Sequence, residues 1–196
     1  LTELADVYLP YRPKRNPRAT VARDRGLEPL ARKILSETEV DPPGAAAEFV
    51  DPENDVPDAD AALAGAADIV AETVSEDMEV RGLLRELIRQ RALFVSKRAR
   101  GAGESAETYS DYFDWTEPVA KAAPHRIHAL LRGARERALT VKAAPEEEKA
   151  LDLIWRTFII HRGLSGAARS RRRFLEDAVA DAYKRLLAPS LENELL

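Results

Sequence analysis

The chain has 196 residues, of which 45% are apolar and 33% are charged, and it contains no cysteine. The lack of cysteine excludes disulfides, zinc–thiolate sites, iron–sulfur clusters and thiol catalysis. No apolar run approaches the roughly 20 residues that span a bilayer, and the start does not resemble a signal peptide, so we expect a soluble, cytoplasmic protein. Alanine makes up a large share of the apolar residues, and this favours packed helices over a large sheet.

Charge is unevenly distributed along the chain. The segment Glu37–Glu79 holds 14 acidic residues and no Lys or Arg, so the net charge of −4 leaves +10 on the rest. We therefore divide the chain into a basic Pro-rich strap with short helices (1–37), an acidic helical segment (38–100) and a basic helical segment (101–196). Because the chain opens with Leu1 and its one methionine is Met78, we expect a piece of a longer protein.

Prolines interrupt the first 17 residues, LTELADVYLPYRPKRNP, and favour an extended strap. A short helix is expected over 20–25, ended by Gly26. A second helix is expected from about Pro29 to residue 37.

The acidic segment is expected to hold a short Ala-rich helix and then two longer ones. Asp58 or Asp60 can cap the first long helix, and Ser75 can cap the next. The expected buried stripes are Leu63, Ala67, Val70 and Val74 in the first long helix and Val80, Leu84, Leu87 and Ile88 in the second.

Two further helices are expected near the end of the chain. The first starts at Pro145 and stops at Gly163, and the second covers about 167–188. Their expected buried stripes are Leu151, Ile154, Trp155, Phe158 and Ile159, then Leu175, Ala178, Val179, Ala182 and Leu186. The one plausible strand is Ala138–Ala143, and one strand makes no sheet, so we predict an all-α, multi-helix fold with a Pro-rich strap.

The stretch DYFDWTEPVAKAAPHRIHALLRG (111–133) has the composition of an active site. His125 and His128 share a helix face and could bind a metal with a third ligand such as Asp114, but nothing in the spacing requires it. A helix that ends near Glu117 and a new one that starts at Pro124 explain the stretch more simply, with its aromatic residues as packing anchors. We expect no catalytic residue, metal or cofactor, and the glycines form no nucleotide-binding loop.

The strongest nucleic-acid signal is ARSRRRF followed by KR. On an ideal helix Arg169, Arg173 and Lys184 form one outward stripe, whereas Arg171 falls on the apolar side and must precede the helix or extend outward. The competing interpretation is internal neutralisation, since Arg172–Glu176, Arg173–Asp177 and Asp181–Arg185 are i, i+4 pairs. The candidate contacts are Arg169, Arg172, Arg173, Lys184 and Arg185, with Lys14 and Arg15 on the strap.

Three collinear stretches resemble the Tex-like transcription accessory proteins of bacteria. They are YLPYRPKRNPRAT with ARDRGLEPLA, then DYFDWTEP with HRIHALLRG, and finally DAYKRLLAPSLENEL. The sequence departs from the family pattern at Trp115, at the pair Ala123-Pro124, and at Ala138.

The resemblance implies an RNA- or DNA-binding transcription accessory protein. It also implies that this piece is a helical scaffold, helix-turn-helix-like near its end, that precedes RNase-H-like, helix-hairpin-helix and OB-fold domains. The implied partners are RNA or DNA, other domains of the same chain and the transcription machinery, with no membrane. The alternative is a protein–protein interaction module without nucleic-acid contact; we do not expect an enzyme.

Overall fold

The computed structural model describes residues 17–195 and is mostly α-helical, as predicted, with one small antiparallel sheet. It divides into two compact units, each built from separated parts of the sequence. The helical unit comprises residues 17–83 with Leu151–Leu187, and the sheet unit comprises Leu84–Ala150 with residues 188–195. The division by charge into 1–37, 38–100 and 101–196 stays a prediction about patterning. The expected strap, with Lys14 and Arg15, lies outside the described residues.

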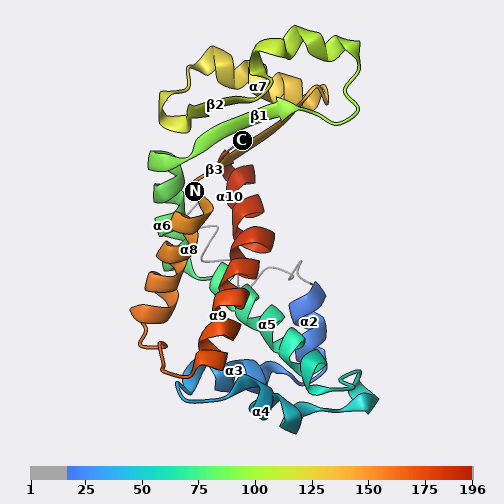
Figure 1. The fold of residues 1–196 in the computed structure, drawn as a ribbon, viewed down its shortest axis with the longest axis vertical. Helices are drawn as coiled ribbons and strands as arrows, with labels where there is room; N and C mark the ends of the chain where they lie inside the picture. Colours follow the sequence, from blue (N-terminus) through green and yellow to red (C-terminus); the bar gives the residue numbers. More distant parts are fainter. Residues whose placement is uncertain (1–16, 196) are drawn as a thin grey trace. The chain divides into compact units, whose positions relative to one another are not determined.

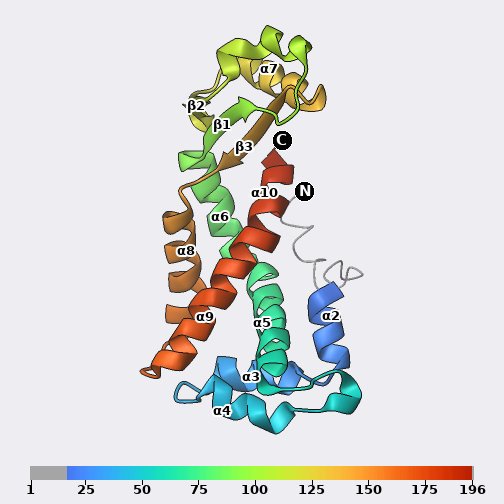
Figure 2. The same cartoon turned by 45° about the vertical axis from the view of Figure 1, so that its right-hand side comes forward.

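The helical unit is organised around one long helix, α5 (Ala59–Ser75), which packs between α2 and α9 (Figure 2) and also contacts α3 and α4. The helices that begin and end within this unit are α2 (Pro17–Asp24), α3 (Glu28–Ser36), α4 (Pro42–Ala46), α5 and α9 (Arg169–Asp181). Single turns of 3-10 helix, η2 (Ala47–Phe49) and η3 (Pro52–Asn54), join α4 to α5. Across residues 17–195, no helix combines the length and apolarity that crossing a bilayer requires.

The helix boundaries in this unit follow the predicted signals. Gly26 adopts φ +78° after α2, and Pro29 lies in the first turn of α3. Asp58 is the N-cap of α5, because its Oδ1 accepts a hydrogen bond from the Ala61 amide at 2.8 Å. The prediction for Ser75 is wrong: it lies in α5 and donates to the Glu72 carbonyl, and Asp77 caps the next helix.

The buried stripe of α5 is rotated by one residue from the predicted one. Ala62 and Ala66 are fully buried, whereas Leu63 and Ala67 are only partly buried; Val70 and Val74 are buried as predicted. Small side chains in this stripe let neighbouring helices approach closely.

Two helices change to a π-helical pitch. α8 (Glu147–Ile154) continues as η6 (Trp155–Ile160), and α9 continues as η7 (Ala182–Leu187) and then as α10 (Ala188–Leu195). A π-turn holds an extra residue and rotates everything after it. After α9, Tyr183 and Leu187 are buried, and the predicted Leu186 is only partly buried.

The sheet unit contains a three-stranded antiparallel sheet in the order β2-β1-β3. The strands are β1 (Leu93–Arg98), β2 (Trp115–Pro118) and β3 (Leu139–Ala144), and β1 follows α6 (Met78–Arg91) after one residue. In the register Phe94 is opposite Glu117 on one side and Ala143 on the other. The prediction of a lone strand is therefore wrong, although β3 itself lies where a strand was expected.

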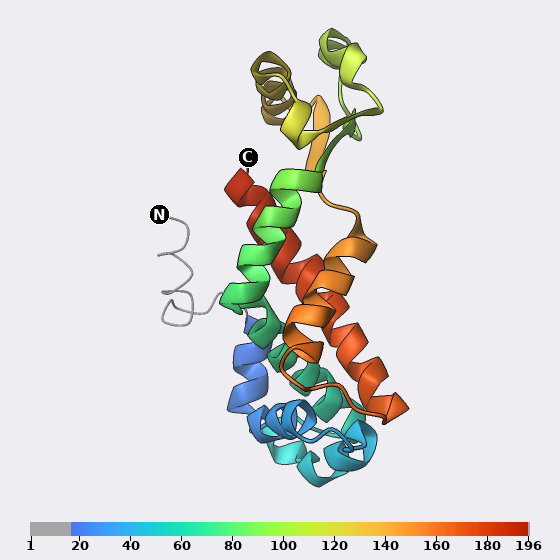
Figure 3. The same ribbon diagram turned by 90° about the vertical axis from the view of Figure 1, so that its left-hand side faces the viewer.

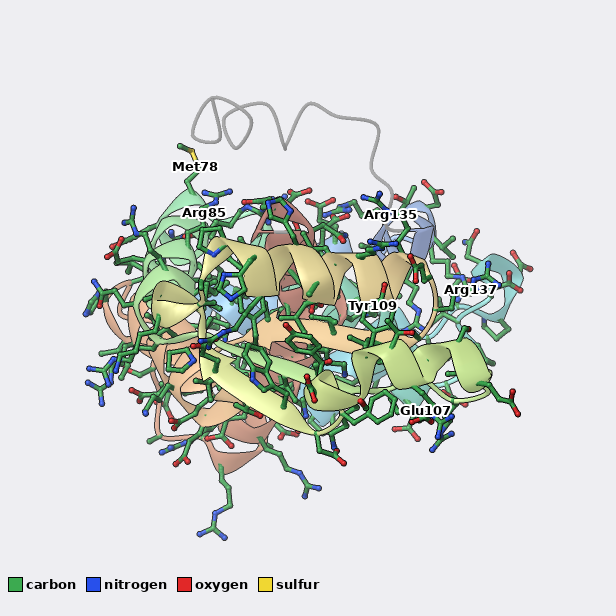
Figure 4. The ribbon with its side chains drawn as sticks, turned by 90° about the horizontal axis from the view of Figure 1, so that it is seen from above. Met78, Arg85, Glu107, Tyr109, Arg135 and Arg137 are labelled. Atoms are coloured by element: carbon green, nitrogen blue, oxygen red, sulfur yellow. The ribbon has the colours of Figure 1, made fainter. Side chains whose placement is uncertain are left out.

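One face of this sheet is covered by η4 (Glu104–Tyr112) and α7 (Pro124–Arg135) (Figure 1), with the short turn η5 (Val119–Lys121) after β2. Phe94, Tyr109, Leu130 and Leu139 are buried together, and Tyr112, Phe113 and Trp115 pack against them. Figure 4 shows Tyr109 between η4 and α7. The aromatic residues are packing anchors, as predicted, but a strand replaces the expected helix end at Glu117.

Candidate nucleic-acid interface

The candidate interface starts at the first turns of α9, where Leu175, Ala178 and Val179 turn inward. This spacing leaves Arg169, Arg172 and Arg173 exposed. The N-cap residue, Ala168, offers no side-chain hydrogen bond to the helix. The outward positions of the three arginines therefore follow from the apolar period of the helix.

Arg171 is the exception, with 1% of its surface exposed. Its guanidinium donates through Nε to the Ile34 carbonyl at 2.8 Å, through Nη2 to the Leu35 carbonyl at 3.1 Å and through Nη1 to the Leu164 carbonyl at 2.6 Å. The expectation that Arg171 precedes the helix or extends outward is wrong.

These acceptors explain why a charged group is buried there. Ile34 and Leu35 belong to the last turn of α3, whose carbonyls lack partners within the helix and carry the negative end of its dipole. Burial lowers the pKa of Arg171, but a guanidinium stays charged at neutral pH. Arg171 therefore joins α3, α9 and the loop before α9, and it does not face a ligand.

Arg172 is exposed but has two neighbours. Its Nε donates to Glu176 Oε1 at 2.9 Å, and its guanidinium carbon lies 5.8 Å from the centroid of the Trp155 ring. At 65% side-chain exposure such an ion pair is worth only tenths of a kcal/mol, so a phosphate could replace the carboxylate.

Arg169 and Arg173 lie one turn apart on α9 and are exposed. Across residues 17–195, neither forms an ion pair with an acidic side chain, so the expected pair Arg173–Asp177 does not form there. These two arginines are therefore the side chains of the candidate site that are best able to donate hydrogen bonds to phosphate oxygens.

Arg185 lies on η7 and is held between two carboxylates. Its Nη2 donates to Asp68 Oδ1 at 2.9 Å, and its Nε lies 3.0 Å from Asp181 Oδ1. Burial raises the pKa of Asp68, and the positive charge of Arg185 partly offsets this increase. Lys184 is exposed and also has interactions within the chain.

A cleft of about 260 Å³ lies beside the arginines of α9. Its lining includes Trp155, Ile159 and Ile160 of η6, Leu164 of the following loop, and Arg172 and Leu175 of α9. Figure 3 shows η6 and α9 side by side. The sequence placed Trp155 in a buried stripe together with Leu151, and both are only partly buried.

Polar residues in and beside the stretch 111–133 form hydrogen bonds and ion pairs within the sheet unit. Tyr109 donates to Glu136 Oε2 at 2.8 Å, Arg132 donates to Glu136 Oε1 at 2.9 Å, and Arg126 pairs with Glu117 at 2.6 Å. Hydrogen bonds from Arg132 and Tyr109 lower the pKa of Glu136. Burial and the bond to Glu136 raise the pKa of Tyr109.

The two histidines of this stretch, His125 and His128, are exposed on α7. Within the described part of the chain, no three His, Asp or Glu side chains lie close enough together to hold a metal ion. The aromatic and ion-paired residues of the stretch 111–133 have a packing role in the structure.

Comparison with known proteins identifies relatives over the whole chain. The chain is 40% identical to "Protein tex" of Bordetella pertussis over 145 residues, which is 74% of this chain and 18% of that protein. It is 35% identical over its full length to "Transcriptional accessory protein Tex" of Neisseria gonorrhoeae, covering 26% of that protein, and 35% identical to the YdcI protein of Bacillus subtilis, covering 27% of it.

The chain spans about a quarter or less of these relatives. The model of the family described as Tex central region-like matches residues 37–196. This match includes the sheet unit, α9 and the cleft. The chain therefore belongs to the Tex central region-like family.

Proposed function

We propose that this chain is a helical scaffold of a transcription accessory protein and that it binds RNA or DNA through the exposed arginines of α9. The observation that carries the proposal is the pair Arg169 and Arg173, one helical turn apart, exposed, and without an acidic partner among residues 17–195. Arginines gathered on one face attract phosphates and release counterions.

The names of two relatives support the coarser part of this proposal, because both are called Tex and one is called a transcriptional accessory protein. The proposal assigns no catalysis to the chain and places it in the cytoplasm. It also gives the chain the task of positioning other domains of the same protein. The helix-turn-helix-like role suggested for the end of the chain would make α9 the recognition element.

Salt dependence tests the proposal. Binding of a single-stranded oligonucleotide should weaken steeply with salt, and the double substitution Arg169→Ala/Arg173→Ala should reduce the slope of log K against log salt by about 1.4. Fluorescence anisotropy at several salt concentrations measures both quantities.

The matched control removes the same charge elsewhere. Arg32 on α3 and Arg89 on α6 are each more than three-quarters exposed. Arg32→Ala/Arg89→Ala should leave the slope nearly unchanged. Equal slopes for both double variants would contradict a site on α9.

A protein–protein interaction module is the alternative. Exposed acidic side chains along the helical unit, such as Glu37, Glu48 and Glu53, support it, because an acidic surface repels phosphates and attracts basic partners. Absence of nucleic-acid binding even at low salt would favour this alternative.

A further inference from the structure

The cleft beside α9 has walls of a kind that bind flat, apolar rings. Ile159, Leu164 and Leu175 are aliphatic, and the Trp155 indole adds an aromatic surface. Ile160 is 48% exposed, so an apolar side chain borders solvent at this point. A ring that enters the cleft would remove that apolar surface from water.

A π-helical segment forms one wall of the cleft. η6 covers Trp155–Ile160, and three residues of the cleft lining come from it. π-turns are rare and occur frequently at functional sites.

The charge around the cleft also favours an anionic chain. Among residues 17–195, no acidic residue lines it, whereas two arginines do, and one of them, Arg172, lies over the Trp155 ring. Arg169 and Arg173 are on the same turns of α9 as Arg172.

A second hollow in the helical unit provides the internal contrast. It is lined by Asp68, Asp177 and Asp181 together with Arg18. Three carboxylates would repel a phosphate backbone there. The basic, aromatic cleft is therefore the one hollow of the two that suits a nucleic acid.

We propose that the cleft receives one unstacked base of a single-stranded nucleic acid, which stacks on Trp155 while Arg169 and Arg173 hold the neighbouring phosphates. This inference rests on the proposed function. Bases of a single strand are free to leave their neighbours and stack on an aromatic ring, and such stacking tolerates any base. The guanidinium of Arg172 can stack on the same base.

The experiment uses Trp155 as its own reporter. The chain has two tryptophans, so Trp115→Phe leaves Trp155 as the only indole. This variant is titrated with a thymidine strand of about ten nucleotides and with an abasic strand of the same length and charge. The thymidine strand should quench Trp155 fluorescence and bind at least about fivefold more tightly than the abasic strand, and the abasic strand should not quench.

Two variants locate the base. In the full chain, Trp155→Leu and Ile160→Glu should each lower the affinity for the thymidine strand by about fivefold or more. Each variant should also discriminate less between the thymidine strand and the abasic strand. Ile160 is half exposed, so its substitution tests the cleft without disturbing the core. Circular dichroism checks that both variants remain folded.

The outcomes separate the two proposals. Salt-dependent binding of both strands with equal affinity and no quenching would overturn the base site and leave the phosphate contacts of α9 standing. Failure of both strands to bind at low salt would overturn both proposals.

Discussion

In the helical unit, charged side chains join one helix to another. Arg171 binds the end of α3, Arg185 binds Asp68 on α5, and Arg23 pairs with the buried carboxylate of Glu72. The sheet unit relies instead on a cluster around Phe94, Tyr109, Leu130 and Leu139.

This contrast bears on the search for function. The arginines of α9 and η7 resemble a single basic patch in the sequence, but Arg171 and Arg185 are used internally. Arg169 and Arg173 are the two that have no such internal contact among residues 17–195. A basic stretch therefore indicates nucleic-acid binding only through those arginines that have no structural role.

The largest effect is expected for Arg171→Leu. Three carbonyls would lose charge-assisted hydrogen bonds in a buried place, which should lower the free energy of unfolding by about 3 kcal/mol. Urea unfolding followed by tryptophan fluorescence measures it. Arg173→Leu, an exposed neighbour on the same helix, should change it by less than about 0.5 kcal/mol. Similar losses for both variants would remove the distinction between structural and free arginines.

The next effect concerns packing in the sheet unit. A Cβ added at Gly133 would lie 2.7 Å from Leu139 Cδ1 and 3.0 Å from Tyr109 Cδ1. Gly133→Ala should therefore destabilise the chain by about 1–3 kcal/mol. In α6, Gly82 has open space around it, so Gly82→Ala should stabilise the chain by about 0.5–1 kcal/mol. The same unfolding assay compares them, and the same sign for both changes would contradict the close packing at Gly133.

A pH-dependent effect tests whether charge also matters in the sheet unit. Hydrogen bonds from Arg132 and Tyr109 hold the pKa of Glu136 below its ordinary value of 4.5. A carboxyl with a lowered pKa contributes stability that is full above 4.5 and is lost as the pH falls through the folded-state pKa. Wild-type stability should therefore fall more steeply below this pH than that of Glu136→Gln, as urea midpoints over acidic pH would measure. Parallel curves would exclude a contribution from Glu136.

The smallest effect is expected for Arg172→Ala. Its ion pair and its contact with the Trp155 ring are exposed, so together they should contribute about 0.5 kcal/mol. In the urea unfolding assay, the free energy of unfolding of Arg172→Ala should be close to that of Arg173→Ala. A loss as large as that of Arg171→Leu would make Arg172 structural and weaken its assignment to the cleft.

Local signals were sufficient for much of the fold. Asp58, Gly26 and Gly163 mark helix ends through their own chemistry, so the helix boundaries near them could be predicted. β1 could not, because LFVSKR directly follows a helix and becomes a strand only by pairing with residues about 20 and 45 positions later. Strand pairing at such separations is invisible to a local pattern.

The candidate site was predicted in part. The exposure of Arg169, Arg172 and Arg173 follows from the apolar period of α9. The role of Arg171 depends on carbonyls of α3 that a helical wheel does not contain. The cleft beside Trp155 was missed because its lining comes from η6, α9 and the loop between them.

The three carbonyl contacts of Arg171 also constrain how the protein is made. Its partners Ile34 and Leu35 lie 137 and 136 residues earlier in the chain. During synthesis α3 leaves the ribosome long before α9. The carbonyls at the end of α3 therefore remain hydrated until Arg171 has been translated. The helical unit can close only after the part of the sheet unit before it in the chain, Leu84–Ala150, has emerged, so a nascent chain stopped before residue 171 leaves the helical unit unfinished.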